Sequence, residues 1–264
     1  MKSKVKLFVN ENQKSKEVEK TVREELEKNQ FQIVEDDFDL GIAIGGDGTF
    51  LRMIKDSEFN SEALYVGINA GTLGFAQEVS IEEVKPFIDC LRKEEYHYEK
   101  IAIGEASVKT DTDEKRFYFL NEMLIRHKEL KTTGFDVQIE NHILEEYVGD
   151  GLLISTSFGS TAYNLSFGGS IVYNTFHTLQ ITPIAPINNK RYHALTNSVI
   201  IPSQKIIKLT PNYKDNNYLL TIDGDNHVFE QVKSIDIAIQ QKTINVIRKK
   251  NYNFIDKIND KFMK

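Results

Sequence analysis

The chain has 264 residues, of which 40% are hydrophobic and 27% charged, and its formal net charge is −6. This composition is that of an ordinary globular protein with enough apolar residues for a full core. The negative charge argues against binding of nucleic acid through a general positive field. No apolar run reaches the roughly 18–20 residues of a membrane span, and the N-terminus lacks the apolar core of a signal peptide. We therefore expect neither nucleic acid nor a membrane as a partner.

The cysteine content points to a reducing compartment. Cys90 is the single cysteine, which excludes an intrachain disulfide. Because it lies beside Phe87, Ile88 and Leu91 in a predicted helix, we expect a buried structural thiol rather than a nucleophile. Together with the missing signal peptide, this predicts a cytoplasmic protein.

The first third of the chain alternates between strand and helix patterns. Val18, Val22 and Leu26 share one face of the first predicted helix, and Ser80 with Glu83 forms a capping box before the last. Such alternation indicates crossover units on a parallel sheet, that is, a Rossmann-like α/β domain. The predicted strands are Lys4–Val9, Phe31–Val34, Leu40–Ile44 and Leu64–Asn69, and the predicted helices are Ser15–Lys28, Thr49–Lys55 and Ile81–Arg92.

From about Glu99 the pattern changes to short apolar pairs at two-residue spacing, such as Ile101/Ile103 and Leu220/Ile222. No helix pattern of ten or more residues occurs between about 99 and 249, which predicts an all-β, sandwich-like domain. Ile255, Ile258 and Phe262 then give a short terminal amphipathic helix. The predicted domains are residues 1–98, with 250–264 as a helix that docks on this first domain, and a β-rich domain of residues 99–249.

The most informative segment is Gly41–Arg52, GIAIGGDGTFLR. A buried strand runs into a glycine turn (Gly45, Gly46 and Gly48), and Thr49 can cap the helix that follows. Free N–H groups and the helix dipole make such a turn a phosphate site. Asp47 places a carboxylate in this turn, which is what phosphoryl transfer to a hydroxyl needs from its base. A plain strand–turn–helix with an Asp in the turn fits these residues alone equally well.

Three further segments carry polar groups suited to a nucleotide. Residues 149–169, GDGLLISTSFGSTAYNLSFGG, offer hydroxyl and backbone donors and one aromatic ring, Tyr163, that could stack on a base. Asn121 and Glu122 follow a predicted strand and could hold a base edge and a ribose. Residues 69–75 form a second glycine loop after a buried strand. Taken singly, the first two fit a polar loop and a strand terminus better, and 223–226 (DGDN) fits a β-turn.

In their order along the chain, GGDGTFLR (45–52), GINAGTLGF (67–75), Asn121–Glu122 and the segment 149–169 resemble the ATP-dependent NAD kinases. The GGDGT run alone is shared with diacylglycerol and sphingosine kinases. The chain also lacks GxxxxGK[ST], so it is not a P-loop kinase. The resemblance covers nearly the whole chain and implies transfer of phosphate from ATP to NAD.

The resemblance also implies residue roles. Asp47 would accept the proton of the adenosine ribose 2′-hydroxyl of NAD, with a divalent cation (Mg²⁺) accompanying ATP. Gly48 and Arg52 would line the phosphates beside Gly45 and Gly46, and Asn121 and Glu122 would hold the nucleoside. The rest of the NAD pocket would comprise Asp150, Thr161, Ala162, Tyr163, Asn164, Leu165, Ser166 and Ala185.

The chain departs from the usual family pattern at Ser157, Phe158, Val148 and Asp225. None of these is the expected base. The resemblance further implies a homo-oligomer, a dimer or a tetramer, with NAD and ATP as small-molecule partners. Two alternatives stay open at this point: a lipid or sphingoid kinase with the GGDGT run, and a non-catalytic dinucleotide-binding regulator. The first would need an apolar groove or a membrane-binding surface, and the second has no use for Asp47.

Overall fold

The computed structural model describes residues 4–71 and 74–263. The chain divides into two compact units, Met1–Lys100 with Thr243–Lys264, and Ile101–Lys242. The long strands β5 (Tyr96–Thr110) and β16 (Val232–Lys249) have residues in both units. Within the described ranges, no helix is long and apolar enough to cross a membrane.

The first unit contains a parallel sheet with the strand order β2–β1–β3–β4, and Asn245 and Val246 of β16 pair with β4 in parallel. Every residue of β3 and β4 is buried, as expected for strands covered on both faces. The predicted α/β alternation is therefore confirmed. The strands are β1 (Lys4–Val9), β2 (Gln32–Ile33), β3 (Leu40–Gly45) and β4 (Leu64–Asn69).

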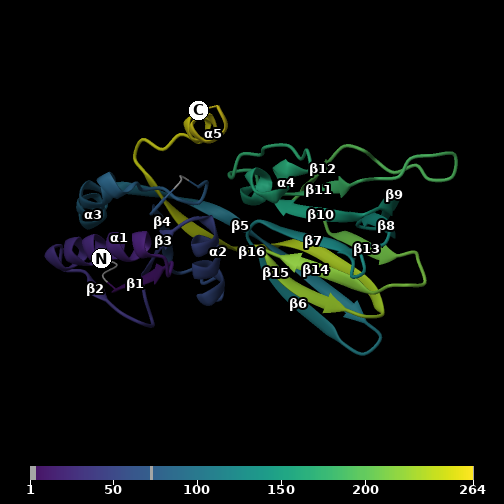
Figure 1. The fold of residues 1–264 in the computed structure, drawn as a ribbon, viewed down its shortest axis with the longest axis horizontal. Coiled ribbons are helices and arrows are strands. Elements are labelled where there is room, and N and C mark those ends of the chain that lie inside the picture. The colour runs from purple at the N-terminus through teal and green to yellow at the C-terminus, as the bar shows by residue number, and fades with distance from the viewer. Residues whose placement is uncertain (1–3, 72–73, 264) are drawn as a thin grey trace. The chain divides into compact units, whose positions relative to one another are not determined.

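Helices cover both faces of this sheet. The apolar faces of α1 (Gln13–Lys28) and α3 (Val84–Arg92) join one core with alternate strand residues, and α2 (Asp47–Asp56) packs its Met53 against the opposite face, at Gly41. Figure 1 shows α1 and α3 together on one side of the strands and α2 on the other. The predicted helix 81–92 is divided into a 3₁₀ turn, η1 (Ile81–Glu83), and α3, and the capping box at its start is confirmed.

Three local predictions in this unit are wrong. Thr49 does not cap α2, because the helix begins two residues earlier and its cap is Gly46. The Thr49 hydroxyl instead accepts a hydrogen bond from the Asn10 side chain. Cys90 is half-buried rather than buried, because it lies at the edge of the α3 apolar face. The terminal helix α5 (Phe254–Phe262) lies in this unit, and it buries Phe254 and Lys257 instead of the predicted apolar face.

The second unit consists of two β-sheets around one core. One sheet is antiparallel, with the order β12–β11–β10–β7–β14–β15, and the other contains β16, β13, β8 and β9 together with the β5–β6 pair. Its strands are β6 (Glu114–Phe119), β7 (Glu122–His127), β8 (Thr133–Ile139), β9 (His142–Gly149), β10 (Gly151–Thr156), β11 (Thr178–Ile184), β12 (Val199–Pro202), β13 (Ile207–Pro211), β14 (Tyr218–Ile222) and β15 (Asp225–Phe229).

The core of this unit takes alternate residues from both sheets, for example Ile125 and Ile154 from one sheet and Val137 and Ile207 from the other. This is the arrangement of a sandwich. Its only helical elements among the described residues are short, η2 (Phe158–Thr161) and α4 (Tyr163–Ser166). The predicted fold class, an α/β domain followed by an all-β domain, is confirmed.

Candidate active site

In the first unit, the glycine turn lies where β3 ends and α2 begins. Gly45 has φ +153°, and a Cβ there would lie 2.5 Å from the Thr49 hydroxyl oxygen, so the turn requires glycine. Gly46 and Gly48 are exposed, and within residues 4–71 and 74–263 a Cβ on either would meet no atom within 4 Å. The first N–H groups of a helix have no partner within the helix. The exposed glycines therefore leave this helix N-terminus open to an anion.

Asp47, the first residue of α2, is half-buried and turns its carboxylate toward residues 75–76. Its Oδ2 accepts a hydrogen bond from the Phe75 N–H and its Oδ1 one from the Ala76 N–H, both at 3.0 Å. An ionised carboxylate has about four acceptor positions. Both oxygens therefore keep capacity for another donor, while the two backbone bonds fix the direction of the group.

The second glycine loop approaches Asp47 closely. A Cβ on Gly74 would lie 2.0 Å from Asp47 Oδ1, so only glycine leaves room for the carboxylate. Gly74 is a site residue that the sequence reasoning did not single out, although it lies in the glycine loop that this reasoning marked. Thr72 and Leu73 of the same loop lie outside the described residues.

Arg52 lies in the second turn of α2 and is exposed. Its Nη2 donates a hydrogen bond to the carbonyl oxygen of Val9, the last residue of β1, at 2.8 Å. This bond leaves the other guanidinium N–H groups for further acceptors. The cation thus lies at the carboxyl end of the parallel strands, the edge at which ligands bind in open α/β sheets.

In the second unit, a carboxylate fixes the backbone at Asn121 and Glu122. Asp223 lies in the tight turn between β14 and β15, and its carboxylate accepts hydrogen bonds from the N–H groups of Leu120, Asn121 and Glu122 at 2.6, 2.8 and 3.0 Å. Positive φ angles at Asp223 and Gly224 and the pairing of Ile222 with Asp225 show a β-turn at 222–225, one residue earlier than the predicted 223–226. The sequence reasoning missed this function of Asp223, because about a hundred residues separate it from its partners.

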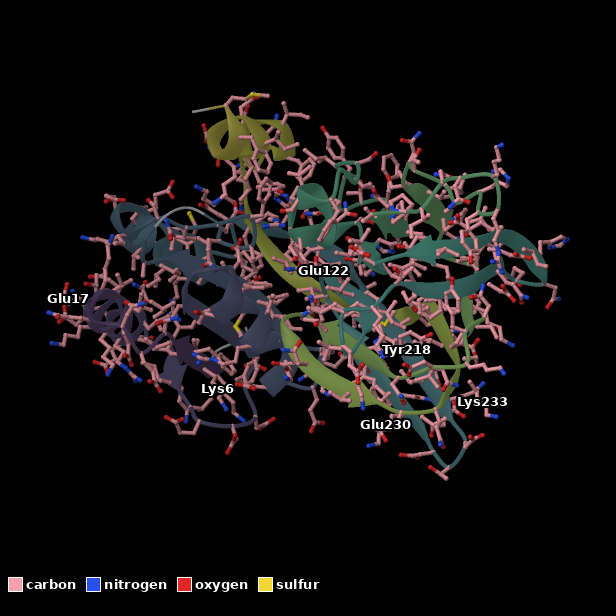
Figure 2. The ribbon with its side chains drawn as sticks, turned by 45° about the vertical axis from the view of Figure 1, so that its right-hand side comes forward. Lys6, Glu17, Glu122, Tyr218, Glu230 and Lys233 are labelled. Carbon is pink, nitrogen blue, oxygen red and sulfur yellow. The ribbon has the colours of Figure 1, made fainter. Side chains whose placement is uncertain are left out.

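Glu122 begins β7 and has one carboxylate oxygen that is buried without a hydrogen-bond partner among the described residues. The nearby Tyr163 backbone N–H favours the ionised form of this side chain. Burial and, next, the nearby Asp223 charge raise the pKa of Glu122 from its ordinary value to about 8. Figure 2 marks Glu122 among strands of this unit, whereas Glu230 and Lys233 lie toward its outer edge. A buried acceptor that lacks a donor is suited to a ligand hydroxyl.

Residues 158–166 form η2 and α4 beside Glu122. Tyr163 is 49% exposed, with its ring edge-on to Phe167 at 4.7 Å, so it is not a core residue. Asn164 is fully buried. Its Nδ2 donates a hydrogen bond to the Ser160 carbonyl, and its Oδ1 accepts one from the Thr182 hydroxyl, so this side chain stabilises the segment. The remaining predicted residues of the segment are half-buried or exposed: Thr161, Ala162, Leu165 and Ser166.

Asp150 and Ala185 lie side by side at the other end of β10. Both are exposed, and the Asp150 N–H donates to the Ile184 carbonyl at 3.0 Å. Glu122, in contrast, pairs with Ser155 near the end of β10. The two positions are five residue steps apart along the strand, roughly 17 Å. The structure therefore does not place Asp150 and Ala185 beside Glu122 within this unit.

The departures from the family pattern have local structural explanations. The Ser157 hydroxyl donates to the Phe176 carbonyl and accepts from the Thr178 N–H, and Phe158 is buried. Val148 is buried in β9, and Asp225 begins β15. No group of three or more His, Cys, Asp or Glu side chains in the described part of the chain could hold a metal ion.

Comparisons with known proteins agree with this architecture. Residues 1–96 match the model of the ATP-NAD kinase N-terminal domain, and residues 120–248 match that of the ATP-NAD kinase C-terminal domain. The chain is 36% identical over 271 residues to the NAD kinase of Finegoldia magna, covering 98% of this chain and 97% of that protein. It is 30% identical over 262 residues to the NAD kinase of Lactobacillus gasseri, with the same coverages of 98% and 97%.

Solved structures share the fold. A yeast NADH kinase complexed with NADH superposes with a TM-score of 0.86 at 20% identity, covering 99% of this chain and 87% of that one. An NAD kinase from Archaeoglobus fulgidus in complex with ATP gives a TM-score of 0.77 at 19% identity, covering 98% of each chain. The matches to both family models and to relatives of the same length lead to one conclusion: the chain belongs to the ATP-NAD kinase family.

Proposed function

We propose that this NAD kinase transfers the γ-phosphoryl group of ATP to the adenosine ribose 2′-hydroxyl of NAD, with Asp47 as the general base. In this step the 2′-oxygen attacks phosphorus, the hydroxyl proton passes to Asp47, and ADP leaves. The observation that carries the proposal is the carboxylate of Asp47, which the Phe75 and Ala76 N–H groups orient while both of its oxygens can still accept a proton.

The glycine turn supports the phosphate part of the proposal. Exposed Gly46 and Gly48 leave the N-terminus of α2 open to an anion, and Arg52 places a cation at the carboxyl end of β1. Phosphoryl transfer depends mainly on positioning and on charge stabilisation of the transferring group. We propose that Mg²⁺ enters with ATP and neutralises charge on its phosphates, as in other phosphoryl transfers.

In the second unit, we propose that Asn121 and Glu122 bind the nucleoside, with ribose hydroxyls on the Glu122 carboxylate. The support is the buried Glu122 carboxylate oxygen that has no donor among the described residues, together with the exposed Tyr163 ring. A hydrogen bond from a ribose hydroxyl would satisfy that oxygen. Asp150, Ala185 and residues 161–166 complete the proposed set of NAD-binding residues.

Assembly and location are part of the same proposal. The family resemblance favours a homo-oligomer, a dimer or tetramer, which light scattering of the purified protein would test. The single cysteine, Cys90, favours a reducing compartment such as the cytoplasm.

The test of the proposed base is Asp47→Asn. The amide keeps the shape of the carboxylate but cannot take the proton, so kcat for NADP⁺ formation from NAD⁺, ATP and Mg²⁺ should fall roughly 10²–10⁴-fold. NAD binding should change little, whereas the melting temperature should fall, because the amide nitrogen cannot accept one of the two backbone N–H groups. A diacylglycerol substrate, run in parallel, should give no product with the wild type. A variant that keeps more than about a tenth of wild-type kcat would remove Asp47 from the mechanism.

A further inference from the structure

The terminal helix α5 buries a lysine, Lys257, which is not part of its predicted apolar face. Lys257 is only 9% exposed. Its ammonium donates a hydrogen bond to the Gln77 carbonyl at 2.5 Å and lies 3.6 Å from the Glu78 carboxylate. Burying an ion pair is costly, and apolar side chains of similar volume often stabilise a fold as well or better. A helix that only covered apolar surface would have no need for this lysine.

The partners of Lys257 are themselves fixed. Glu78 accepts a hydrogen bond from the Lys249 N–H at 3.0 Å and lies 3.3 Å from Nη1 of Arg248, which is fully buried. Arg248 also donates to Glu99 at 2.8 Å. Lys257 therefore connects α5 to Glu78, which β16 holds through Arg248 and Lys249, and to the Gln77 carbonyl after the second glycine loop.

The charge of Asp47 reaches this cluster. Burial and, next, repulsion by Arg248 lower the pKa of Lys257 to about 8, against the attraction of Glu78 and of Asp47. Hydrogen bonds connect the two groups through neighbouring residues. Asp47 accepts from the Phe75 and Ala76 N–H groups, and Lys257 donates to the carbonyl oxygen of the next residue, Gln77.

The other end of α5 contacts the same segment. The rings of Phe262 and Phe75 lie 5.3 Å apart at an interplanar angle of 35°. Thus α5 contacts residues 75–77 twice, once through the Phe75 side chain and once through the Gln77 carbonyl. The backbone N–H groups that orient Asp47 belong to Phe75 and Ala76.

We propose that α5 positions the general base: Lys257 and Phe262 hold residues 75–77 in place, and the N–H groups of Phe75 and Ala76 in turn orient the Asp47 carboxylate. This inference rests on the proposed role of Asp47. Lys257 and Phe262 are positioning residues and touch no reacting atom. A loss of either should allow the carboxylate to rotate, and misplacement by about 1 Å can cost on the order of 10²-fold in rate.

The experiment compares Lys257→Met and Phe262→Ala with two matched controls on exposed positions, Lys250→Met and Met263→Ala. Initial rates give kcat and the KM values for NAD and ATP, and thermal unfolding shows that each variant is folded. We expect kcat to fall about 10- to 100-fold in both test variants, with both KM values within about twofold of wild type. Both controls should match the wild type.

Two further variants separate positioning from a structural role. Phe262→Tyr, which keeps the ring contact with Phe75, should restore kcat. In an Asp47→Asn background, Lys257→Met and Phe262→Ala should cause little additional loss, because the group that they position is already inactive.

The possible results are distinguishable. A test variant that lowers the melting temperature but keeps kcat would overturn the inference and leave α5 as a stabilising helix. Equal kcat losses with and without Asp47→Asn would overturn it as well, since the effect would not pass through Asp47. If Asp47→Asn alone keeps wild-type kcat, the proposed function itself fails, whatever the α5 variants show.

Discussion

Gly74→Ala tests whether the direction of the Asp47 carboxylate matters for turnover. The added Cβ would lie 2.0 Å from Asp47 Oδ1, so this oxygen must move by about 1.4 Å to reach an ordinary contact of 3.4 Å. The backbone of Gly74 is not in the left-handed region, so alanine causes no strain apart from this clash. The displaced carboxylate would lose hydrogen bonds from Phe75 and Ala76, and a bond to a charged group is worth about 1.5–3 kcal/mol.

A shift of this size in a reacting group costs on the order of 10²-fold in rate. We therefore expect kcat for NADP⁺ formation at saturating NAD and ATP to fall about 100-fold, and the melting temperature to fall as well, because hydrogen bonds to the carboxylate are lost. Gly71→Ala is the matched control, because a Cβ there meets no atom of the described residues within 4 Å. The reasoning is refuted if Gly74→Ala retains kcat within about threefold of Gly71→Ala. It is also refuted if Gly74→Ala lowers kcat as much in an Asp47→Asn background as in the wild type.

Two predictions concern the second unit. Because the pKa of Glu122 is raised from 4.5 to about 8 in the folded protein, the native state keeps a proton that the unfolded state loses. The free energy of unfolding should therefore fall by up to about 1.4 kcal/mol per pH unit between these values. In denaturant unfolding across this range, Glu122→Gln should lack that slope; equal slopes would show that Glu122 titrates normally. Tyr163→Ala should raise KM for NAD roughly 5- to 150-fold, from about 1–3 kcal/mol of stacking and hydrogen bonding. Since the ring is 49% exposed, the melting temperature should barely change, and a lower melting temperature with an unchanged KM would assign Tyr163 to packing.

Local patterns in the sequence were sufficient for the fold class. Short apolar strands between amphipathic helices predicted the parallel sheet, because strands covered on both faces need continuous apolar runs. Two-residue apolar spacing predicted the sandwich, because its sheets alternate between core and solvent. The glycine turn at Gly45–Gly48 and the capping box at Ser80 could also be predicted from the sequence, since both depend on residues a few positions apart. The cap at Thr49 was misassigned because Gly46 can begin a helix without any side-chain bond.

The orientation of the proposed catalytic groups was decided by tertiary structure. Asp47 is held by a backbone N–H 28 residues away, the Glu122 N–H by a carboxylate 101 residues away, and Lys257 bonds to a carbonyl 180 residues away. No spacing rule connects such positions, since only the folded chain brings them together. Lys257 shows the consequence most clearly. A helical pattern counts lysine as a solvent-facing residue, and only the buried Glu78 and the Gln77 carbonyl make its burial favourable.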